Sequence, residues 1–307
     1  MDLSIVIPLY NEEDSIAELT KKISDVLKEL DLNSEICFVD DGSTDDSLAR
    51  IKQLKEQNEN IKILSFRKNY GKSAALSEGF KMASGDIIIT LDADLQDDPT
   101  EIPNLIRKIN DGYDLVSGWK KKRQDPITKT LPSKLFNYIT ARMTGIALHD
   151  FNCGLKAYRK EVIKEIPVYG SLHRYLPVLA HWKGYAIGEI IVRHQSRKYG
   201  VTKYGWRRFF DGFFDLFTVL FLTRYRQKPL HLFGFFGMIS LLAGFIISLY
   251  LTILWFQGYG IGNRPLLFLG ILLIIVGMQS FSIGLIGEMI TNLKDEEGSY
   301  SIREKIL

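Results

Sequence analysis

Asp92, Asp94 and Gln96 alternate along a short segment that directly follows the apolar residues 87–91. Carboxylate and side-chain amide oxygens are hard ligands, which suit Mg²⁺ or Mn²⁺ rather than zinc. A divalent cation held there would chiefly neutralise a diphosphate leaving group. The same residues also fit a solvated acidic turn. Their place after a buried strand favours the metal site.

Asp40 and Asp41 form a second acidic group at the end of the strand-like residues 35–39. An aspartate at this place can accept hydrogen bonds from a nucleobase or a ribose. Residues 43–45 (Ser, Thr and Asp) could instead cap the helix that follows. Both interpretations can hold, each for different residues of the segment.

Lys72 stands in a Gly-Lys-Ser triplet that looks like the end of a phosphate-binding P-loop. A P-loop needs a glycine five residues before the second one, and Phe66 occupies that position. A P-loop nucleoside triphosphatase is therefore excluded. A lysine at a helix N-terminus still suits a phosphate or a uronate-like anion.

Positions 120–134 carry six basic side chains and one acidic side chain: Lys120, Lys121, Lys122, Arg123, Lys129, Lys134 and Asp125. A second basic group follows at residues 193–203. These groups predict phosphate capture and contact with anionic lipid headgroups, and a solvated face is the alternative. Asp150 follows the first basic group, which could deliver an anionic acceptor to it. A lone aspartate is otherwise a cap or a surface residue.

Strand and helix patterns alternate through the first 120 residues. The apolar periodicity predicts strands at 3–9, 35–39, 61–66, 87–91 and 115–117, and helices at 14–30, 45–57, 71–83 and 99–110. Such alternation indicates an α/β protein with a mostly parallel sheet covered on both faces. Ligands bind such sheets at the carboxyl ends of the strands, which here gives the loops 8–13, 40–46, 67–72 and 92–98.

The chain of 307 residues has a net charge of only +3, but the charges are segregated. Residues 1–114 have a net charge of −11, and residues 115–228 one of +15. This asymmetry indicates a site that handles metal ions and anions together, and it does not favour nucleic acid as a partner. The two cysteines, Cys37 and Cys153, form no C-x-x-C pair, which excludes a zinc ribbon or a disulfide scaffold.

Two long apolar segments near the C-terminus, residues 230–256 and 265–287, contain no Lys, Arg, Asp or Glu. Each is long enough to span a bilayer, and the eight-residue connector makes them a hairpin. The basic residues before the hairpin predict a cytoplasmic N-terminal part by the positive-inside rule. Residues 206–223 mix phenylalanines with arginines, which indicates a helix at the membrane interface or a helix that closes the domain.

The motif segments together resemble a known family. Residues 4–13, 39–43 and 92–99 look like the nucleotide-sugar domain of family 2 glycosyltransferases with the GT-A fold. Residues 69–76 and 150–155 resemble the polyprenyl-phosphate glycosyltransferases, relatives of dolichol-phosphate mannose synthase. The two apolar segments are similar to those of bacterial bactoprenol glucosyltransferases of O-antigen modification.

This resemblance implies four parts of the chain: a cytoplasmic GT-A domain (1–204), an amphipathic interface helix (205–228), a two-helix transmembrane hairpin (229–290) and a cytoplasmic tail (291–307). With the residue patterns, it implies that the nucleotide sugar is bound by Pro8, Tyr10, Glu12, Asp40, Asp41, Lys72, Asp92 and Arg197. The metal would be bound by Asp94 and Gln96, and the acceptor phosphate by Lys120, Arg123, Lys129 and Ser133. Asp94 and Asp150 are the candidate catalytic residues, and Asp150 is either a base or a positioner. Lys120 and Lys129 stand where the family often has arginines, and a lysine binds phosphate as a point charge.

The expected reaction is the inverting transfer of a hexose from a nucleotide sugar to undecaprenyl or another polyprenyl phosphate at the cytoplasmic face of the inner membrane. UDP-glucose is the expected donor, and GDP-mannose, UDP-N-acetylhexosamine and a UDP-aminopentose are the alternatives. The glycines of the hairpin permit a homo-oligomer such as a tetramer. A processive polysaccharide synthase is disfavoured because residues 203–207 lack the order Gln-x-x-Arg-Trp. A non-catalytic membrane scaffold would not need Asp92, Asp94 and Gln96.

Overall fold

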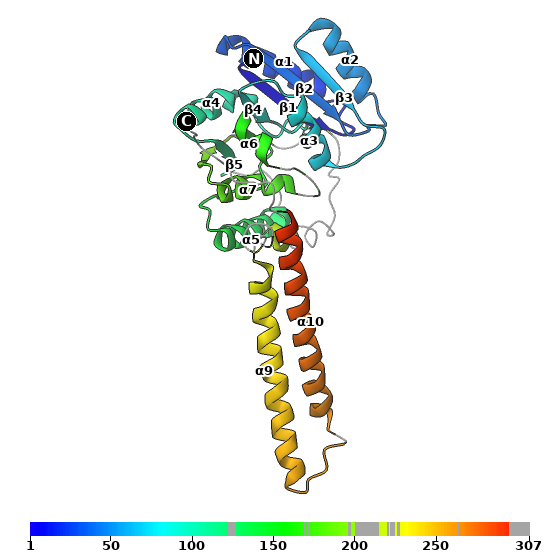
Figure 1. Ribbon diagram of the computed structural model, residues 1–307. Coiled ribbons are helices and arrows are strands. Elements are labelled where there is room, and N and C mark those ends of the chain that lie inside the picture. The colour runs from blue at the N-terminus through cyan, green and yellow to red at the C-terminus, as the bar shows by residue number, and fades with distance from the viewer. Residues whose placement is uncertain are drawn as a thin grey trace. The chain divides into compact units, whose positions relative to one another are not determined.

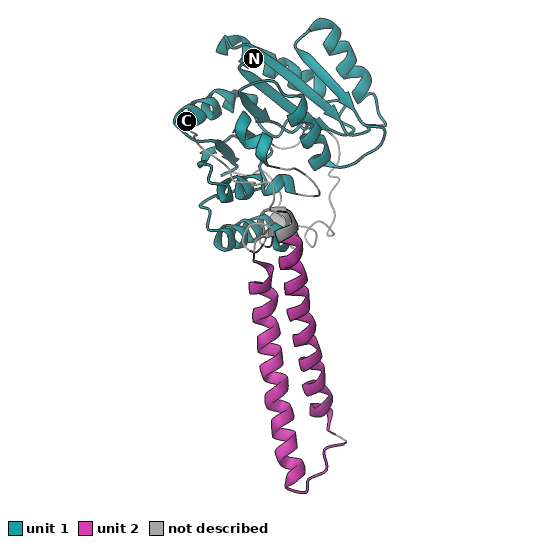
Figure 2. Ribbon diagram, viewed as in Figure 1, with its two compact units in different colours: residues 1–219 teal, residues 220–307 magenta. Residues whose placement is uncertain are grey.

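The computed structural model describes residues 1–121, 127–166, 168, 170, 172–195, 198–199, 215–219, 221, 225, 228–262 and 264–294, without the side chains of 127–132 and 292–294. The chain divides into two compact units, Met1–Val219 and Leu220–Leu307 (Figure 2).

The first unit is built on a seven-stranded mixed sheet with the strand order β3-β2-β1-β4-β6-β5-β7 (Figure 1). The strands are β1 (Leu3–Leu9), β2 (Ser34–Asp40), β3 (Ile61–Ser65), β4 (Ile87–Thr90), β5 (Leu115–Trp119), β6 (Lys156–Arg159) and β7 (Ile187–Ile191). Strands β1 to β4 pair in parallel, as do β5 and β7, whereas β6 runs antiparallel between β4 and β5. The predicted α/β class is confirmed, and the one reversed strand makes the sheet mixed.

Helices cover both faces of this sheet. The helices of the unit are α1 (Ile16–Leu30), α2 (Ser47–Gln57), α3 (Lys72–Met82), α4 (Ile102–Asn110), α5 (Ile127–Thr144), α6 (Lys160–Glu165) and α7 (Leu176–Trp182), with short 3₁₀ turns η1 (Pro99–Glu101) and η2 (Leu172–Arg174). The predicted helix at 99–110 thus begins as the turn η1. The other predicted helices and strands lie within two residues of their expected ends.

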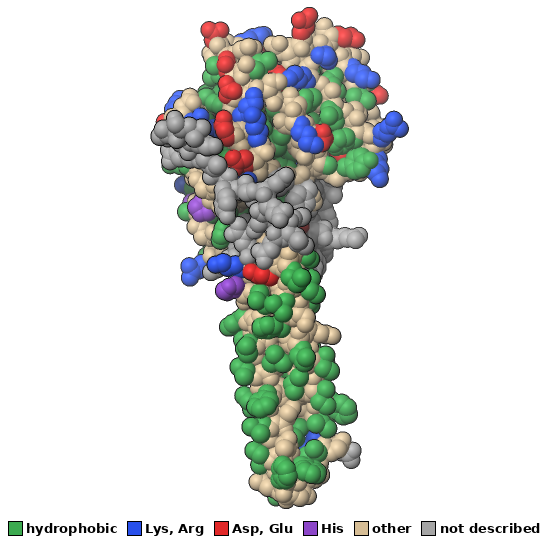
Figure 3. Space-filling model, viewed as in Figure 1, with side chains coloured by type: hydrophobic (Ala, Val, Ile, Leu, Met, Phe, Trp, Pro, Cys, Tyr) green, Lys and Arg blue, Asp and Glu red, His purple; other side chains and the backbone are tan. Residues whose placement is uncertain are grey.

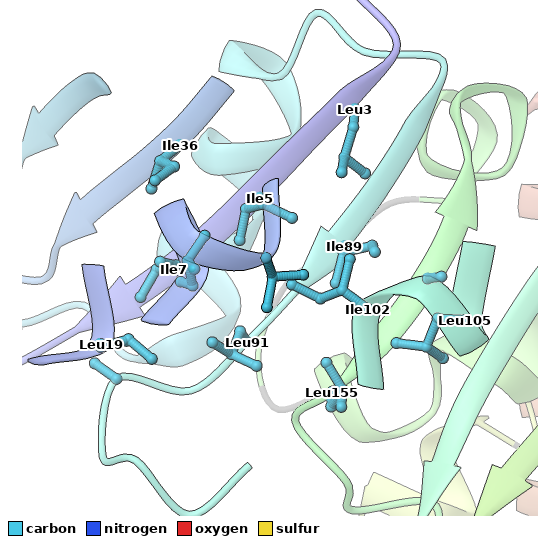
Figure 4. Close-up of a cluster of buried hydrophobic side chains, with 14 of the residues drawn as sticks. Leu3, Ile5, Ile7, Leu19, Ile36, Ile89, Leu91, Ile102, Leu105 and Leu155 are labelled. Carbon is cyan, nitrogen blue, oxygen red and sulfur yellow. The ribbon is translucent and has the colours of Figure 1, made fainter. Parts of the chain in front are cut away.

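Side chains of successive strand residues point to opposite faces and so supply two separate cores. On one face, alternate residues of β1 pack with side chains of α1 and α4, including Ile5, Leu19 and Leu105 (Figure 4). On the other face, Val6 packs in a second cluster with Phe80 of α3 and other helix residues. This double burial explains why β1 and β4, near the middle of the sheet, are mostly apolar.

A buried carboxylate at the opposite end of the sheet from the predicted ligand loops ties three segments together. Glu35, at the start of β2, accepts hydrogen bonds from Ser4 Oγ (2.6 Å) and the backbone N–H of Ser84 (2.6 Å). Its other oxygen lies 2.7 Å from Lys62 Nζ. Burial acts to raise the pKa of Glu35, but Lys62 and these hydrogen bonds outweigh it and lower the pKa.

Because the folded-state pKa of Glu35 is depressed, its stabilising contribution is present above about pH 4.5 and is lost as the pH falls below that value. We therefore expect Glu35→Gln to lower the thermal unfolding midpoint at pH 7 and to flatten its decline between about pH 5 and pH 3. Thermal unfolding of the detergent-solubilised chain across this range measures both effects. The exposed Glu29 provides the control Glu29→Gln. An acid decline as steep in Glu35→Gln as in the parent chain would contradict the prediction.

The second unit contains two long apolar helices, α9 (Pro229–Phe256) and α10 (Pro265–Lys294). Their mean hydropathies of 2.3 and 2.4, and lengths above 25 residues, fit membrane spans, and Figure 3 shows mainly hydrophobic side chains along them. The predicted transmembrane hairpin is supported by these two helices.

Glycines bring the two helices of the hairpin into backbone contact. A Cβ atom built on Gly237 would lie 2.9 Å from the carbonyl oxygen of Gly277, and one on Gly244 would lie 2.8 Å from that of Gly270. In addition, Glu288 of α10 accepts a hydrogen bond from the backbone N–H of Leu230 (3.3 Å), in the first turn of α9. First-turn N–H groups have no partner within their own helix, so this carboxylate satisfies one of them.

Candidate functional site

The carboxyl ends of β1 and β2 carry loops that are hydrogen-bonded to one another. Asn11, in the left-handed conformation with φ 50°, donates from its backbone N–H to Ser43 Oγ (2.9 Å) and accepts from the N–H of Thr44 (2.8 Å). Glu12 donates from its N–H to Ser47 Oγ (2.9 Å). These contacts place the predicted nucleoside-binding residues of the first loop, Pro8, Tyr10 and Glu12, beside the second loop.

The carboxylates of Asp40 and Asp41 brace the loops around them. Asp40 is buried and accepts from the N–H of Ser43 (3.0 Å) and from Ser65 Oγ (2.6 Å). Asp41 accepts from the N–H groups of Tyr70 (2.7 Å) and Gly71 (2.8 Å), and burial raises the pKa of Asp41. Both residues therefore hold the loops after β2 and β3 in place, and their contact with a nucleoside stays a prediction.

Lys72 and Asp92 form an ion pair between the start of α3 and the end of β4. Burial acts to raise the pKa of Asp92, but the charges of Lys72, Lys120 and Lys156 outweigh it and lower the pKa to about 2. Asp92 is therefore ionised at neutral pH. The sequence predicted that both residues bind the substrate, but it did not predict the ion pair between them.

A glycine lets a second loop pack directly against Asp92. A Cβ atom built on Gly154 would lie 2.5 Å from Cγ of Asp92, so only a glycine fits there. Thr90, the last residue of β4, donates from Oγ1 to the carbonyl oxygen of Gly154 (2.8 Å). The segment 150–154 is thereby held against the acidic turn that follows β4.

The predicted metal ligands Asp94 and Gln96 lie half-buried in this turn. Leu95 between them has φ 59°, and the N–H of Gln96 donates to Asp94 Oδ1 (3.2 Å). The carbonyl oxygen of Gln96 accepts from the N–H of Gln195 (2.9 Å), so the turn is joined to the segment after β7. Backbone contacts on both sides thus fix the turn.

Lys120 pairs with Asp97, which is almost fully buried; Lys120 Nζ lies 2.8 Å from Asp97 Oδ1. Burial raises the pKa of Asp97 although Lys120 acts to lower it, and the acidic surroundings raise the pKa of Lys120 despite its own burial. Lys120 is therefore a fixed positive charge under the turn, and its predicted contact with an acceptor phosphate is not tested.

The donor set of the turn fits a cation that is shared with a substrate. Within the part of the chain that the structure describes, no three His, Cys, Asp or Glu side chains converge as a metal cage. Asp94 and Gln96 offer oxygen ligands, while Asp92 is held by Lys72. Mg²⁺ is commonly bound by one or two carboxylates plus substrate phosphates, so this sparse set suits such an ion.

Asp150 is buried in the loop that faces the turn, with 1% of its surface exposed. The Oδ1 atom of Asp150 accepts a hydrogen bond from the N–H of Asn152 (3.1 Å). The N–H of Phe151, the residue after Asp150, donates to Asn137 Oδ1 of α5 (3.4 Å). The loop is thus tied to α5, the helix on which Ser133 lies half-buried and on which Lys129 also falls. The side chain of Lys129 lies outside the described residues, as do Arg123, Arg197 and most of the expected interface helix.

Lys156 is a buried residue of this site that the sequence patterns did not single out. It begins β6, is 4% exposed, and donates from Nζ to the carbonyl oxygen of Cys153. Burial lowers the pKa of Lys156, while the charges of Asp150 and Asp92 act to raise it. The sequence feature that could have indicated its role is the position of this lysine at the start of an apolar strand. Burial also raises the pKa of the neighbouring Cys153 thiol to about 12, so this thiol is unreactive.

Comparison with known proteins agrees with this geometry. The model of the family "Glycosyl transferase family 2" matches residues 4–167, which include the loops after β1, β2 and β4 and the segment 150–154. Among solved structures, glucosyl-3-phosphoglycerate synthase from Mycobacterium tuberculosis, in complex with Mn²⁺ and uridine-diphosphate-glucose, has a TM-score of 0.55 at 20% identity. The alignment covers 72% of this chain and 78% of that one, and it shows a shared fold.

Two curated relatives are similar over nearly the whole chain. The dodecaprenyl-phosphate galacturonate synthase of Rhizobium johnstonii is 36% identical over 99% of this chain and 93% of its own length. The undecaprenyl-phosphate 4-deoxy-4-formamido-L-arabinose transferase of Klebsiella pneumoniae is 35% identical over 96% and 89%. With the family match over more than half of the chain, the protein belongs to glycosyltransferase family 2.

Proposed function

We propose that this protein transfers a sugar from a nucleotide donor to the phosphate of a membrane-embedded polyprenyl lipid. One observation carries the proposal: relatives named for polyprenyl-phosphate acceptors match 96–99% of the chain, the apolar hairpin included. The similarity therefore extends beyond the nucleotide-sugar fold to the part that fits a membrane.

In the proposed reaction, a phosphate oxygen of the lipid attacks the anomeric carbon of the sugar. The new C–O bond forms as the bond to the nucleoside diphosphate breaks, and a single displacement inverts the anomeric configuration. A phosphate monoester is already ionised near pH 7, so no strong base is required. Positioning and charge neutralisation then supply most of the rate.

The residues take the following roles in this proposal. Asp94 and Gln96 would hold Mg²⁺ or Mn²⁺, which neutralises charge on the departing diphosphate. Lys72 orients Asp92 beside the donor, and Asp150 positions the attacking phosphate. The burial of Asp150 favours such a positioning role over that of a base exchanging protons with solvent. Lys120, Arg123, Lys129 and Ser133 remain the proposed acceptor-phosphate residues.

We further propose that the first unit works at the cytoplasmic face of the inner membrane, with the hairpin crossing the bilayer twice. Helix α5 supports contact with lipid because it exposes apolar and basic side chains together. Leu135 and Tyr138 are 51% and 69% exposed, and Lys134 and Arg142 are exposed beside them. A helix with such a surface suits the interface of an anionic bilayer.

The sugar is the open part of the proposal. The names of the two relatives contain galacturonate and 4-deoxy-4-formamido-L-arabinose, and neither contains glucose. UDP-glucose is thus one candidate donor beside UDP-galacturonate, UDP-4-deoxy-4-formamido-L-arabinose, GDP-mannose and UDP-N-acetylhexosamine.

Incubation of the purified protein with undecaprenyl phosphate, Mn²⁺ or Mg²⁺ and each radiolabelled donor tests the proposal. We expect one donor to label the lipid extract, with no label when undecaprenyl phosphate is omitted. Chelation of the divalent cation is expected to abolish labelling. If no donor labels the lipid in the presence of either cation, the proposed function is wrong and the scaffold alternative gains support.

A further inference from the structure

Two facing residues of neighbouring strands hold the backbone of Asp150 from both sides. Ser117 of β5 and Glu189 of β7 are partners in the parallel register. Glu189 Oε1 accepts a hydrogen bond from the N–H of Asp150 (3.1 Å), and Ser117 Oγ donates to the carbonyl oxygen of Asp150 (3.3 Å). The residue that carries the candidate positioning carboxylate is therefore clamped by a cross-strand pair.

The carboxylate of Glu189 makes further contacts to the same loop. Its Oε1 also accepts from the N–H of His149 (2.9 Å), and its Oε2 lies 2.7 Å from His149 Nδ1. The His149 ring is stacked on Trp119, the last residue of β5, with 4.0 Å between centroids and 13° between planes. The Glu189 side chain is only 12% exposed, whereas the His149 side chain is 62% exposed.

We propose that Glu189 is a positioning residue for sugar transfer, acting through the backbone of His149 and Asp150. The inference rests on the proposed function, because it assigns Glu189 a role in the step that Asp150 serves. Hydrogen bonds from backbone N–H groups to a carboxylate are stronger than those between neutral groups. A single carboxylate that accepts two consecutive N–H groups fixes the path of the loop between α5 and β6 as it passes β7.

The far end of the loop is anchored independently. Thr90 binds the carbonyl oxygen of Gly154, and Lys156 binds that of Cys153. Loss of Glu189 would therefore free residues 149 and 150 while residues 153 and 154 stay against Asp92. This arrangement predicts a local change at Asp150 rather than unfolding of the site.

Amide hydrogen exchange of the full-length protein in nanodiscs tests the clamp without any substrate. In Glu189→Ala, we expect exchange in peptides that cover residues 149–151 to become about tenfold faster or more, because two N–H groups lose a charged acceptor. Glu189→Gln keeps a side-chain oxygen that can accept both N–H groups and should exchange near the parent rate. The exposed Glu161 provides the control Glu161→Ala. Unchanged exchange in Glu189→Ala would overturn the clamp.

Kinetics with the donor and acceptor found in the labelling assay test the positioning role. We expect Glu189→Ala to lower kcat by about ten- to a hundredfold, with the KM for the nucleotide sugar unchanged, and Glu189→Gln to restore most of kcat. In an Asp150→Asn background, Glu189→Ala should cost less than threefold further, because both changes affect one group. His149→Ala keeps both backbone N–H groups that donate to Glu189 and should retain most of the activity.

The outcomes separate the two hypotheses. If Asp150→Asn leaves the parent kcat unchanged, the role proposed for Asp150 is wrong and the positioning role of Glu189 fails with it. If Asp150→Asn is impaired but Glu189→Ala lowers kcat by the same factor in both backgrounds, Glu189 acts through general stability and the inference alone is overturned. If no donor labels the lipid at all, the proposed function fails, and faster exchange at residues 149–151 still supports the clamp.

Discussion

Asp94→Ala is expected to abolish sugar transfer and to weaken cation-dependent binding of the nucleotide sugar. Asp94 supplies the only carboxylate of the two proposed metal ligands, Asp94 and Gln96, in the turn after β4. Charge neutralisation by a bound divalent cation contributes several kcal/mol to such a reaction, so the loss in kcat should reach about a thousandfold. Steady-state kinetics and titration of donor binding with and without Mn²⁺ measure the two effects.

A nearby aspartate provides the control for this change. Asp98 lies four residues further on, where its side chain caps η1 by accepting from the N–H of Thr100 (3.1 Å). Asp98→Asn preserves a capping oxygen and should retain activity within a few-fold. Cation-dependent turnover in Asp94→Ala at the parent rate would show that the metal is held elsewhere.

Gly154→Ala is expected to lower kcat by about a hundredfold while the protein stays folded. The added methyl group would lie 2.5 Å from the Asp92 carboxylate, so either this carboxylate leaves Lys72 or the segment 150–154 moves away. Displacement of a positioning group by about 1 Å can cost about a hundredfold in rate. Kinetics should be measured together with the thermal unfolding midpoint.

The matched glycine for this comparison is Gly260, where a Cβ atom would meet nothing within 4 Å. Gly260→Ala should leave both kcat and the unfolding midpoint near the parent values. If Gly154→Ala is as active as Gly260→Ala, the packing of Gly154 on Asp92 has no part in catalysis.

The sequence was sufficient to predict the elements that build the acidic end of the sheet. Strands β1, β2 and β4 are mostly apolar and lead into polar loops, so their carboxyl ends could be aligned in advance. Local periodicity and one topological rule determine such features. The hairpin was predictable for a similar reason, because residues 230–256 and 265–287 contain no Lys, Arg, Asp or Glu.

The contacts within the site depended on tertiary packing and could not be predicted in this way. Lys72 and Asp92 were both singled out, but 20 residues separate them, and only the assembled sheet makes them an ion pair. Strand β6 follows a long connection and reverses direction, which no periodicity encodes. Glu189 and Ser117 become a pair only through the register of β5 and β7.

The roles of charged residues were also harder to predict than their places. Asp40 and Asp41 looked like free ligands, yet their oxygens accept hydrogen bonds from the chain's own loops. The burial of Lys156 was not predicted, because a lysine beside apolar residues usually extends into solvent. A buried charged residue can be predicted only when its partners in the folded chain are known, because an isolated charge is too costly to bury.

The glycine seam between α9 and α10 bears on how the protein assembles in lipid. Gly237, Gly244, Gly270 and Gly277 are all taken up by contacts inside one chain. These glycines, which allow close helix contact, thus pack within one hairpin rather than against a second copy of the chain. A homo-oligomer within the bilayer would therefore have to use surfaces of the hairpin other than this glycine seam.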